Sequence, residues 1–494
     1  MFALPSPDEL LSGLCLLCVG LAALHGVHRL FLLGAWARHT PDHPPPIAED
    51  LPFITVQLPL YNERDVAARL IARVAQLDWP RDRLEVQVLD DSTDDTRTIV
   101  DSAVAGARAT GLKICAIHRD HRSGFKAGAL AEALPSARGE LIAIFDADFL
   151  PERDFLRRLV PWFSDPGIGM VQARWAHLNP EDSALTIAQK VLLDGHFVVE
   201  HAGRQALGCW FNFNGTAGLW RRRCVDESGG WQGDTLTEDL DLSYRAQLRG
   251  WRFRYDTTTL VPAELPSTLL AFQAQQQRWA LGSIQVAKKL SRTILRAEVP
   301  LRVRAEAMAH LWASLAWLPA LGLAILLPWA ILFPPASRLF AVGAWAVVVC
   351  TMPGVVFYRA ATGTFRGILT TIVLSLGMIP SQARVVTGGL TGMTRPFVRT
   401  PKRGSAGSPS YESRRQFSLP ELVLALPLLA AAVVSLARGD VQTVPFLLIF
   451  GGGLLWVGSG GAQSPRTAVP EAAHSAHAGP FIHPISASNA GTRA

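Results

Sequence analysis

Pairs of acidic side chains follow two of the hydrophobic runs in this sequence. Asp90 and Asp91 come after one run, and Asp146 and Asp148 come after another. Two carboxylates one residue apart at the end of a strand can hold Mg²⁺ or Mn²⁺, because these hard cations prefer oxygen ligands and share them with substrate phosphates. An ordinary solvated loop remains the alternative, since short acidic motifs also arise by chance.

Other side chains that could bind or activate a substrate follow strands or open helices. They are Tyr61 and Glu63 after the first expected strand, Lys126 at the start of one expected helix, and Glu238 and Asp239 at the start of another. A structural interpretation is open for each of these groups. Asn62 could cap a helix, the spacing from Thr235 to Glu238 fits a capping box, and Lys126 could be an ordinary surface charge.

A third group combines an amide, a permanent cation and an indole. Gln275, Arg278 and Trp279 stand at positions i, i+3 and i+4, so they share one face of a helix. An arginine can bind a diphosphate through two N–H groups, and a tryptophan offers a flat apolar surface to a sugar ring. The alternative is a tryptophan at the membrane interface beside an arginine that extends to the lipid headgroups.

The composition indicates a membrane protein and excludes several other classes. The 494 residues are 49% hydrophobic and 18% charged, with a mean hydropathy of +0.21, which is too apolar for a wholly soluble chain. The net charge of +6 suits a cytoplasmic face on anionic lipid, and no nucleic-acid partner is expected, because that would require a clustered basic patch. The six cysteines are scattered, so we expect reduced thiols rather than a zinc or disulfide framework.

The first half of the chain predicts one membrane helix followed by an α/β domain. Residues 1–40 form the expected N-terminal transmembrane helix, whose flanking charges place the next segment in the cytoplasm, and residues 41–50 form a proline-rich linker. In residues 51–264, short aliphatic runs alternate with helical patterns, which predicts a mostly parallel, Rossmann-like sheet. The clearest expected strands are 53–58, 84–89, 112–117 and 141–145. Ligands bind at the carboxyl ends of such strands, where the acidic pairs stand.

The second half predicts helices on and across the membrane. The expected segments are an amphipathic interfacial helix in 265–305, two transmembrane helices in 306–358, an interfacial or re-entrant helix in 366–392, a basic loop in 393–416, two transmembrane helices in 417–458 and a disordered tail in 459–494. The lengths of the apolar runs and the basic residues between them support this order.

The order of these motifs resembles the processive family 2 glycosyltransferases of the cellulose synthase superfamily. The signatures of that family are Asp-Asp, Asp-x-Asp, Thr-Glu-Asp and Gln-x-x-Arg-Trp, which match Asp90/Asp91, Asp146/Asp148, Thr237 to Asp239, and Gln275/Arg278/Trp279. Longer strings such as VQVLDDSTDDT, KAGAL, VQARW, FNGTAGLWR and ELPSTLLAFQAQQQRW look like the plant cellulose-synthase-like mannan and glucomannan synthases and related glucan synthases. The resemblance covers residues 52–283.

The resemblance implies a GT-A fold that binds a nucleotide sugar, and it implies a role for each motif. The implied nucleoside site contains Tyr61, Glu63, Asp90 and Asp91, with Lys126 near the diphosphate and Asp146 and Asp148 holding the metal and nucleotide. By the same resemblance, Asp239 is the general base with Glu238 beside it, and Arg278 and Trp279 lie between the leaving group and the acceptor. Gln275 belongs to the same catalytic motif. A carboxylate base suits this reaction, because a sugar hydroxyl is a weak nucleophile.

The expected protein is therefore a membrane-embedded, inverting and processive β-glycosyltransferase. It would polymerise a β-1,4-linked glucan, mannan or glucomannan from UDP-glucose or GDP-mannose at the cytoplasmic face of a bacterial inner membrane or a secretory-pathway membrane. Its partners would be the lipid bilayer, the growing polysaccharide and export proteins of the cell envelope. Residues 397–402 resemble the gating loop of the family, with Arg399 where a valine is usual.

Two other functions are left open by the sequence. One is the transfer of a single sugar to a lipid or glycolipid, although Gln275, Arg278 and Trp279 weigh against it. The other is a non-catalytic membrane scaffold that only binds a nucleotide sugar. A complete set of base, metal and leaving-group residues makes the scaffold the weaker alternative.

Overall fold

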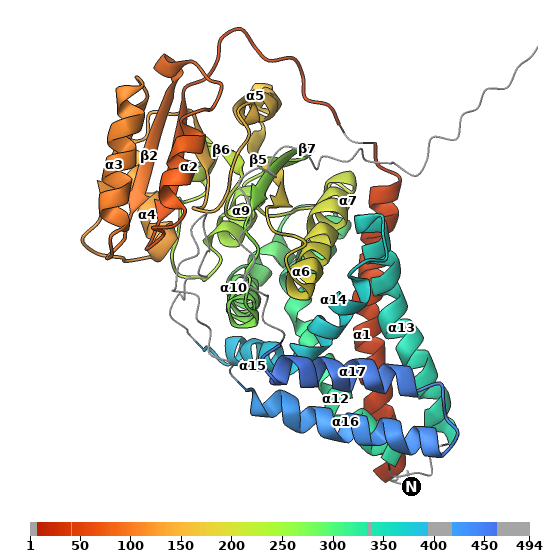
Figure 1. Cartoon of the computed structure of the whole chain (residues 1–494). Coiled ribbons are helices and arrows are strands. Elements are labelled where there is room, and N and C mark those ends of the chain that lie inside the picture. The colour runs from red at the N-terminus through yellow and green to blue at the C-terminus, as the bar shows by residue number, and fades with distance from the viewer. Residues whose placement is uncertain (1–6, 41, 333–336, 394–416, 462–494) are drawn as a thin grey trace, which may run out of the picture.

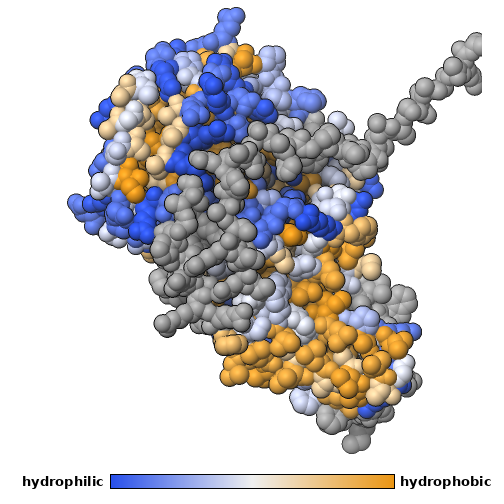
Figure 2. All heavy atoms as spheres, in the orientation of Figure 1, coloured by the Kyte–Doolittle hydropathy of each residue, from blue (hydrophilic) through white to orange (hydrophobic). Residues whose placement is uncertain are grey.

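A computed structural model describes residues 7–40, 42–332, 337–393 and 417–461 (Figure 1). The expected gating motif at 397–402 and the tail from residue 462 lie outside these ranges. The α/β body occupies one end of the described chain, and long helices occupy the other. Figure 2 shows the same division by hydropathy, with hydrophilic residues covering the α/β body and hydrophobic residues covering the helical end.

Within the described ranges, seven strands form one sheet in the order β3-β2-β1-β4-β6-β5-β7. The strands are β1 (Ile54–Leu60), β2 (Leu84–Asp90), β3 (Lys113–His118), β4 (Leu141–Ile144), β5 (Ile168–His177), β6 (Gly218–Arg221) and β7 (Arg252–Ala263). β6 runs antiparallel to β4 and β5, and the other neighbouring strands run parallel. The four strands expected from the sequence are present, and the prediction of a mostly parallel sheet is confirmed.

Helices cover both faces of the sheet because alternate side chains of each strand point to opposite faces. In β4, Leu141 and Ala143 join the core on one face, whereas Ile142 and Ile144 join the core on the other. The first face packs against α2 (Ala67–Val74), α3 (Thr96–Ala109) and α5 (Phe155–Leu159). The second face packs against α4 (Phe125–Ala133), α8 (Arg222–Glu227) and α9 (Glu238–Leu248). Short 3₁₀ segments lie at η1 (Arg81–Arg83), η2 (Leu134–Ser136), η3 (Val160–Ser164) and η5 (Ala313–Ala316).

A helical rod with an unusual centre connects the sheet to the membrane helices. It consists of α6 (Ala184–Asp194), the π-helix η4 (Gly195–Glu200) and α7 (His201–Ala206). Ser183 and Thr186 form a capping box that starts α6. The rod contacts α14, α13 and α1 along its length. A π-helix is rare and is frequently found at functional sites.

The two helices after the sheet support the pocket and lead to the membrane. α10 (Leu269–Arg296) begins at Thr268, whose hydroxyl accepts from the backbone N–H of Ala271, and α11 (Leu301–Leu311) follows. One side of α10 packs on α9 and α11, and another packs on α15. α10 lies within residues 265–305, where the sequence predicts an amphipathic helix.

The remaining helices are α1 (Pro7–Ala37), α12 (Trp317–Leu332), α13 (Ser337–Thr362), α14 (Ile368–Gly377), α15 (Ile379–Leu390), α16 (Leu419–Ala437) and α17 (Val444–Gly458). In the part of the chain that the structure describes, three helical segments are long and apolar enough to cross a membrane: Glu9–Ala37, Ala313–Leu332 and Leu419–Ala437. The paired helices α16 and α17 lie side by side.

Two apolar segments are more bent or shorter than an ordinary membrane span. The interfacial or re-entrant helix expected in 366–392 is a pair of helices, α14 and α15, bent by 53°, which fits either a broken span or a re-entrant loop. The bend occurs where Pro380 enters the first turn of α15, because proline lacks the N–H that would continue the preceding helix. α17 is an apolar helix of 15 residues, which is shorter than the roughly 20 residues of an ordinary span.

Candidate active site

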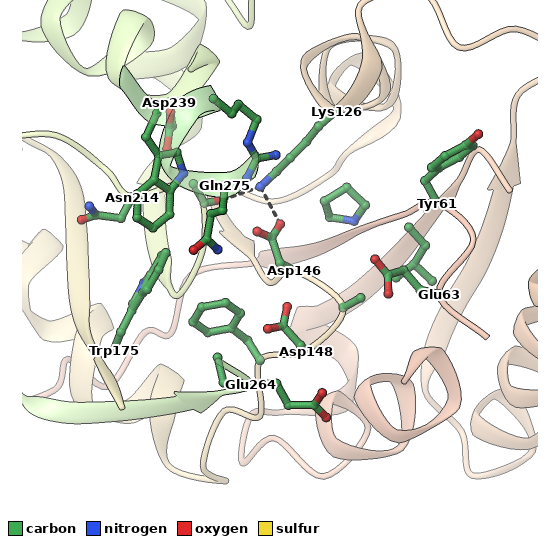
Figure 3. A pocket seen from close by; sticks show the side chains of 18 of the residues that line it. Tyr61, Glu63, Lys126, Asp146, Asp148, Trp175, Asn214, Asp239, Glu264 and Gln275 are labelled. Carbon is green, nitrogen blue, oxygen red and sulfur yellow. Dashed lines mark hydrogen bonds and ion pairs between the residues drawn. The ribbon is translucent and has the colours of Figure 1, made fainter. Parts of the chain in front are cut away.

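A pocket opens at the carboxyl ends of β1, β2 and β4 and is closed on one side by α10 (Figure 3). The expected site residues that line it are Tyr61, Glu63, Asp91, Lys126, Asp146, Asp148, Glu238, Asp239, Gln275, Arg278 and Trp279. These residues come from segments far apart in the sequence. The parallel strands bring them together because their carboxyl ends meet at one edge of the sheet.

Asp90 is a correction to the expected site, because it does not line the pocket. Its side chain is fully buried at the end of β2, where Oδ1 accepts from the backbone N–H of Ser92 at 2.9 Å. His118 Nδ1 lies 3.1 Å from Oδ2. Successive side chains at a strand end point in opposite directions, so only Asp91 of this pair reaches the pocket.

Asp91 is held by an arginine that the sequence did not single out. Arg119 donates from Nε to Asp91 Oδ1 at 2.7 Å and from Nη2 to Oδ2 at 2.5 Å. The hydrogen bonds to Asp91 raise the pKa of Arg119 although burial opposes them. A bidentate pair of this kind fixes the carboxylate plane, so Asp91 presents a constant orientation to the pocket.

The pocket end near Tyr61 also carries a cation. The guanidinium carbon of Arg122 lies 3.4 Å from the centre of the Tyr61 ring, and both side chains line the pocket. Burial lowers the pKa of Arg122. Asn62 has a left-handed φ of 53°, and its Oδ1 accepts from the backbone N–H of Thr93 at 2.8 Å. Asn62 thus ties two loops of the site together, and its interpretation as a helix cap is wrong.

Lys126 lies at the centre of the site, as Figure 3 shows. Its Nζ donates to Asp146 Oδ1 at 2.5 Å and to the carbonyl oxygen of Gly215 at 2.9 Å. Burial alone would lower the pKa of Lys126, but the charges of Asp146, Glu238 and Asp239 outweigh it and raise this pKa. The side chain is therefore a half-buried, paired cation, and the interpretation as an ordinary surface charge is wrong.

Asp239 has an unusual protonation equilibrium. Burial and then the charge of Glu238 raise the pKa of Asp239 to about 7, although Lys126 and the backbone N–H of Leu240 oppose them. Thr237, rather than Thr235, occupies the N-cap position of α9, so the expected capping box is wrong. A carboxyl group with a pKa near neutrality is well matched to accepting a proton during catalysis.

Gln275, Arg278 and Trp279 all point into the pocket from the same face of α10. The helix can approach because position 282 is glycine: a Cβ there would lie 2.5 Å from Thr237 Cγ2. Leu236 also donates its backbone N–H to Gln285 Oε1 at 2.9 Å. These contacts hold α10 against the loop that carries Asp239. The interpretation of Gln275, Arg278 and Trp279 as side chains that only anchor the helix in lipid is therefore wrong.

The residues present fit a divalent cation bound together with a diphosphate. Within the described ranges, no group of three or more His, Cys, Asp or Glu side chains could hold a metal by itself. Asp146 and Asp148 nevertheless line the same pocket. Mg²⁺ is commonly bound by one or two carboxylates, with phosphate oxygens and water completing its shell. The pair therefore suits a cation that arrives with its substrate.

Sequence reasoning missed several residues that line the pocket: Arg122, Trp175, His177, Asn214 and Glu264. Trp175 and Asn214 belong to the strings VQARW and FNGTAGLWR, which were used only for the resemblance. The centre of the Trp175 ring lies 4.9 Å from the ring centres of both Phe149 and Phe197. The signal for these two residues was present in the motifs, whereas their place in the pocket depends on the fold.

Known proteins match this fold and these motifs. The model of the family "Glycosyltransferase like family 2" matches residues 52–282. The chain is 44% identical over 254 residues to glucomannan 4-beta-mannosyltransferase 2 of Arabidopsis thaliana, over 50% of this chain and 48% of that protein. It is 33% identical over 419 residues to glucomannan 4-beta-mannosyltransferase 7 of the same plant, over 80% of this chain and 74% of that protein.

A solved structure shares the fold. It is the mannosyltransferase PcManGT from Pyrobaculum calidifontis in complex with GDP-Man and Mn²⁺, which is 24% identical with a TM-score of 0.53, over 74% of this chain and 99% of that one. The chain spans about half the length of several of the plant relatives that it matches. The GT-A-like fold and the resemblance expected from the sequence are confirmed. The chain belongs to glycosyltransferase family 2, among the relatives of the cellulose-synthase-like glucomannan mannosyltransferases.

Proposed function

We propose that this protein is a membrane-embedded, inverting β-glycosyltransferase that polymerises a β-1,4-linked mannan or glucomannan from a nucleotide sugar. GDP-mannose is the favoured donor, because the relatives are named as mannosyltransferases and the solved neighbour holds GDP-Man. The observation that carries the proposal is the convergence of Asp239, Lys126 and Trp279 on one pocket. The apolar helices next to this pocket supply the membrane anchor.

Asp239 is the proposed general base. The acceptor hydroxyl gives its proton to the Asp239 carboxylate as its oxygen attacks the anomeric carbon of the donor sugar, and the bond to the nucleoside diphosphate breaks. A single displacement inverts an α-linked donor into a β-linked product. A raised pKa strengthens Asp239 as a base while leaving much of it ionised at neutral pH.

Cations at the other side of the reacting bond stabilise the leaving group. Lys126 and Arg278 line the pocket beside Asp146, where a diphosphate would develop negative charge. A bound Mg²⁺ or Mn²⁺ would be held by Asp146 and Asp148 and would neutralise part of this charge. Tyr61 and Arg122 form a stacked pair at the far end of the pocket and are the proposed contacts for the nucleoside, with Glu63 and Asp91.

The proposed orientation places the α/β body in the cytoplasm, where nucleotide sugars are made. The basic residues that follow α1 favour this side under the positive-inside rule. The membrane is either a bacterial inner membrane or a secretory-pathway membrane. Export proteins of the cell envelope remain the proposed partners for the product.

The test supplies labelled GDP-mannose and UDP-glucose separately to the full-length protein in membranes. The expected product is a long polymer that β-1,4-mannanase digests, and the matched control is Asp239→Asn in the same membranes. Labelled sugar found only on lipid would replace the polymerase with single transfer to a lipid acceptor. Nucleotide-sugar binding without any glycoside product from either donor would support the scaffold and refute the enzyme.

A further inference from the structure

Asn214 stands in the wall of the pocket between two histidines that sequence reasoning did not use. His201 Nε2 donates to Asn214 Oδ1 at 2.6 Å, and Asn214 Nδ2 donates to His196 Nε2 at 3.0 Å. His196 Nδ1 in turn donates to Glu200 Oε2 at 3.1 Å. The four side chains form one continuous row of hydrogen bonds, in the order His201, Asn214, His196 and Glu200, and Asn214 lines the pocket.

The charge of Glu200 fixes the direction of its hydrogen bond with His196. Arg29 Nε and Arg204 Nη1 lie 3.4 Å and 3.8 Å from the Glu200 carboxylate. Although burial would raise the pKa of Glu200, its bond from His196 and the nearby arginines hold this pKa well below its usual range. An ionised carboxylate only accepts hydrogen bonds, so His196 donates to it from Nδ1. The NH₂ group of Asn214 faces His196 Nε2, because the amide oxygen faces His201.

His201 completes the assignment from the other side. It is fully buried, and its Nδ1 has no hydrogen-bond partner among the described residues. Burial lowers the pKa of His201 well below its usual range, so the ring is neutral. A neutral ring with its proton on Nε2 donates to Asn214 Oδ1 and leaves only an acceptor unpaired. The two histidines therefore hold the amide of Asn214 in one orientation.

The π-helix explains how the row is built. His196 and His201 are separated by five residues, and a π-helix joins residues i and i+5. Their ring centres are 4.3 Å apart. In an α-helix, side chains five residues apart diverge, because neighbours on one face are three or four residues apart. The local π-helical turn thus places both histidines against Asn214.

We propose that Asn214 binds hydroxyl groups of the acceptor sugar, and that His196 and His201 are positioning residues that fix its orientation. His201 occupies one lone pair of the Asn214 amide oxygen, and His196 occupies one N–H of its NH₂ group. One lone pair and one N–H therefore remain for a ligand. A sugar offers neighbouring hydroxyls that can accept and donate at once. This inference rests on the proposed glycosyltransferase function.

The position of Asn214 favours the acceptor rather than the nucleotide. The next residue, Gly215, lies beside the proposed base, since a Cβ there would be 3.0 Å from Asp239 Oδ2. In Figure 3, Asn214 and Trp175 lie at the opposite end of the pocket from Tyr61 and Glu63. The acceptor hydroxyl must approach Asp239, so a residue at this end contacts the sugar that receives the bond.

The test measures sugar transfer and nucleotide release separately in the purified full-length protein, with the donor that the wild type uses. In Asn214→Ala and His201→Phe, transfer should fall about tenfold, as expected for the loss of one or two hydrogen bonds to a buried polar group. The donor KM should stay within about twofold of the wild type, because the nucleotide end is untouched. The number of nucleotides released per sugar transferred should rise, since water replaces a misplaced acceptor.

Two further variants separate positioning from folding. His201→Gln keeps an N–H that can reach Asn214 and should recover most of the transfer. His310→Phe removes a half-buried histidine that bonds Tyr244 instead and should leave the ratio unchanged. Normal transfer by Asn214→Ala would overturn the inference. So would losses of transfer and of donor affinity that are as large in His201→Gln as in His201→Phe. If the wild type forms no glycoside, the proposed function itself is refuted. If the wild type is active and Asn214→Ala is normal, only the role of Asn214 is refuted.

Discussion

Replacing Asp239 by asparagine should abolish sugar transfer and at the same time stabilise the folded protein. Asparagine has nearly the same shape as aspartate but cannot accept the proton of the acceptor hydroxyl. The nucleotide site is formed by other residues, so the affinity for the donor nucleotide should change little. The opposite signs of the two effects follow from the environment that raises the pKa of Asp239.

The size of the stabilisation follows from the pKa. The pKa of Asp239 is about 7 in the folded protein and 3.8 for an ordinary aspartate. Between these values the folded state binds the proton and the unfolded state does not, so the free energy of unfolding falls as pH rises and is lowest above pH 7. At about 1.4 kcal/mol for each pH unit, ionisation of Asp239 costs the fold roughly 4 kcal/mol at most. Asp239→Asn removes this cost at pH 8 and has none to remove near pH 3.

The pH dependence of activity provides an independent measurement on the active protein. The value of kcat/KM reports groups of the free enzyme, so it should fall about tenfold per pH unit below pH 7 and level off above it. Removing the neighbouring negative charge by Glu238→Gln should lower the pKa of Asp239, and the midpoint should move to lower pH by on the order of one unit.

Thermal unfolding in detergent at pH 5 and pH 8 and initial rates from pH 5 to 9 check both effects. Asp239→Asn should show a higher Tm than the wild type at pH 8 and a smaller difference at pH 5. An Asp239→Asn protein with substantial transfer activity would refute the base assignment. A midpoint that does not move in Glu238→Gln would refute the electrostatic explanation of the raised pKa, while leaving the base assignment intact.

Two other predictions concern the cation and the backbone of the site. Chelation of divalent cations should abolish transfer, and added Mn²⁺ or Mg²⁺ should restore it. The Asp148→Asn variant should require at least about tenfold more cation for the same activity. An unchanged cation requirement would exclude Asp148 as a ligand. Gly215→Ala should reduce both stability and activity, because Gly215 has a φ of +83° and the added Cβ would lie 3.0 Å from Asp239 Oδ2. The strain alone costs about 1–2 kcal/mol. Gly230→Ala is the matched control, since Gly230 has a φ of +66° with nothing within 4 Å of the added Cβ. Equal loss of activity in both variants would show that only backbone strain matters.

Much of the α/β body could be predicted because its signals are local. An aliphatic run followed by acidic residues predicts a buried strand and its carboxyl end without knowledge of any partner strand, and β1, β2, β3 and β4 were found in this way. The helical spacing of Gln275, Arg278 and Trp279 likewise required only that α10 be a helix. The length of an apolar run predicted α1 and α16 in the same manner.

The errors arose where the outcome depends on a contact with a distant segment. Asp90 and Asp91 are equivalent in the sequence, and only the direction of each side chain at the end of β2 decides that Asp91 meets Arg119 and the pocket. The bend between α14 and α15 was likewise not predicted, because packing against neighbouring helices stabilises both halves around Pro380.

The sequence by itself determined which chemical groups are available and the order in which they occur, because residue type and local period depend on the covalent chain alone. The tertiary structure alone decided the environment of each group. The pKa of Asp239 depends on Glu238 and on burial, and the orientation of Asn214 depends on a π-helical turn that holds His196 and His201. Electrostatic and hydrogen-bond energies depend on distance in space, so no spacing along the chain could have supplied them.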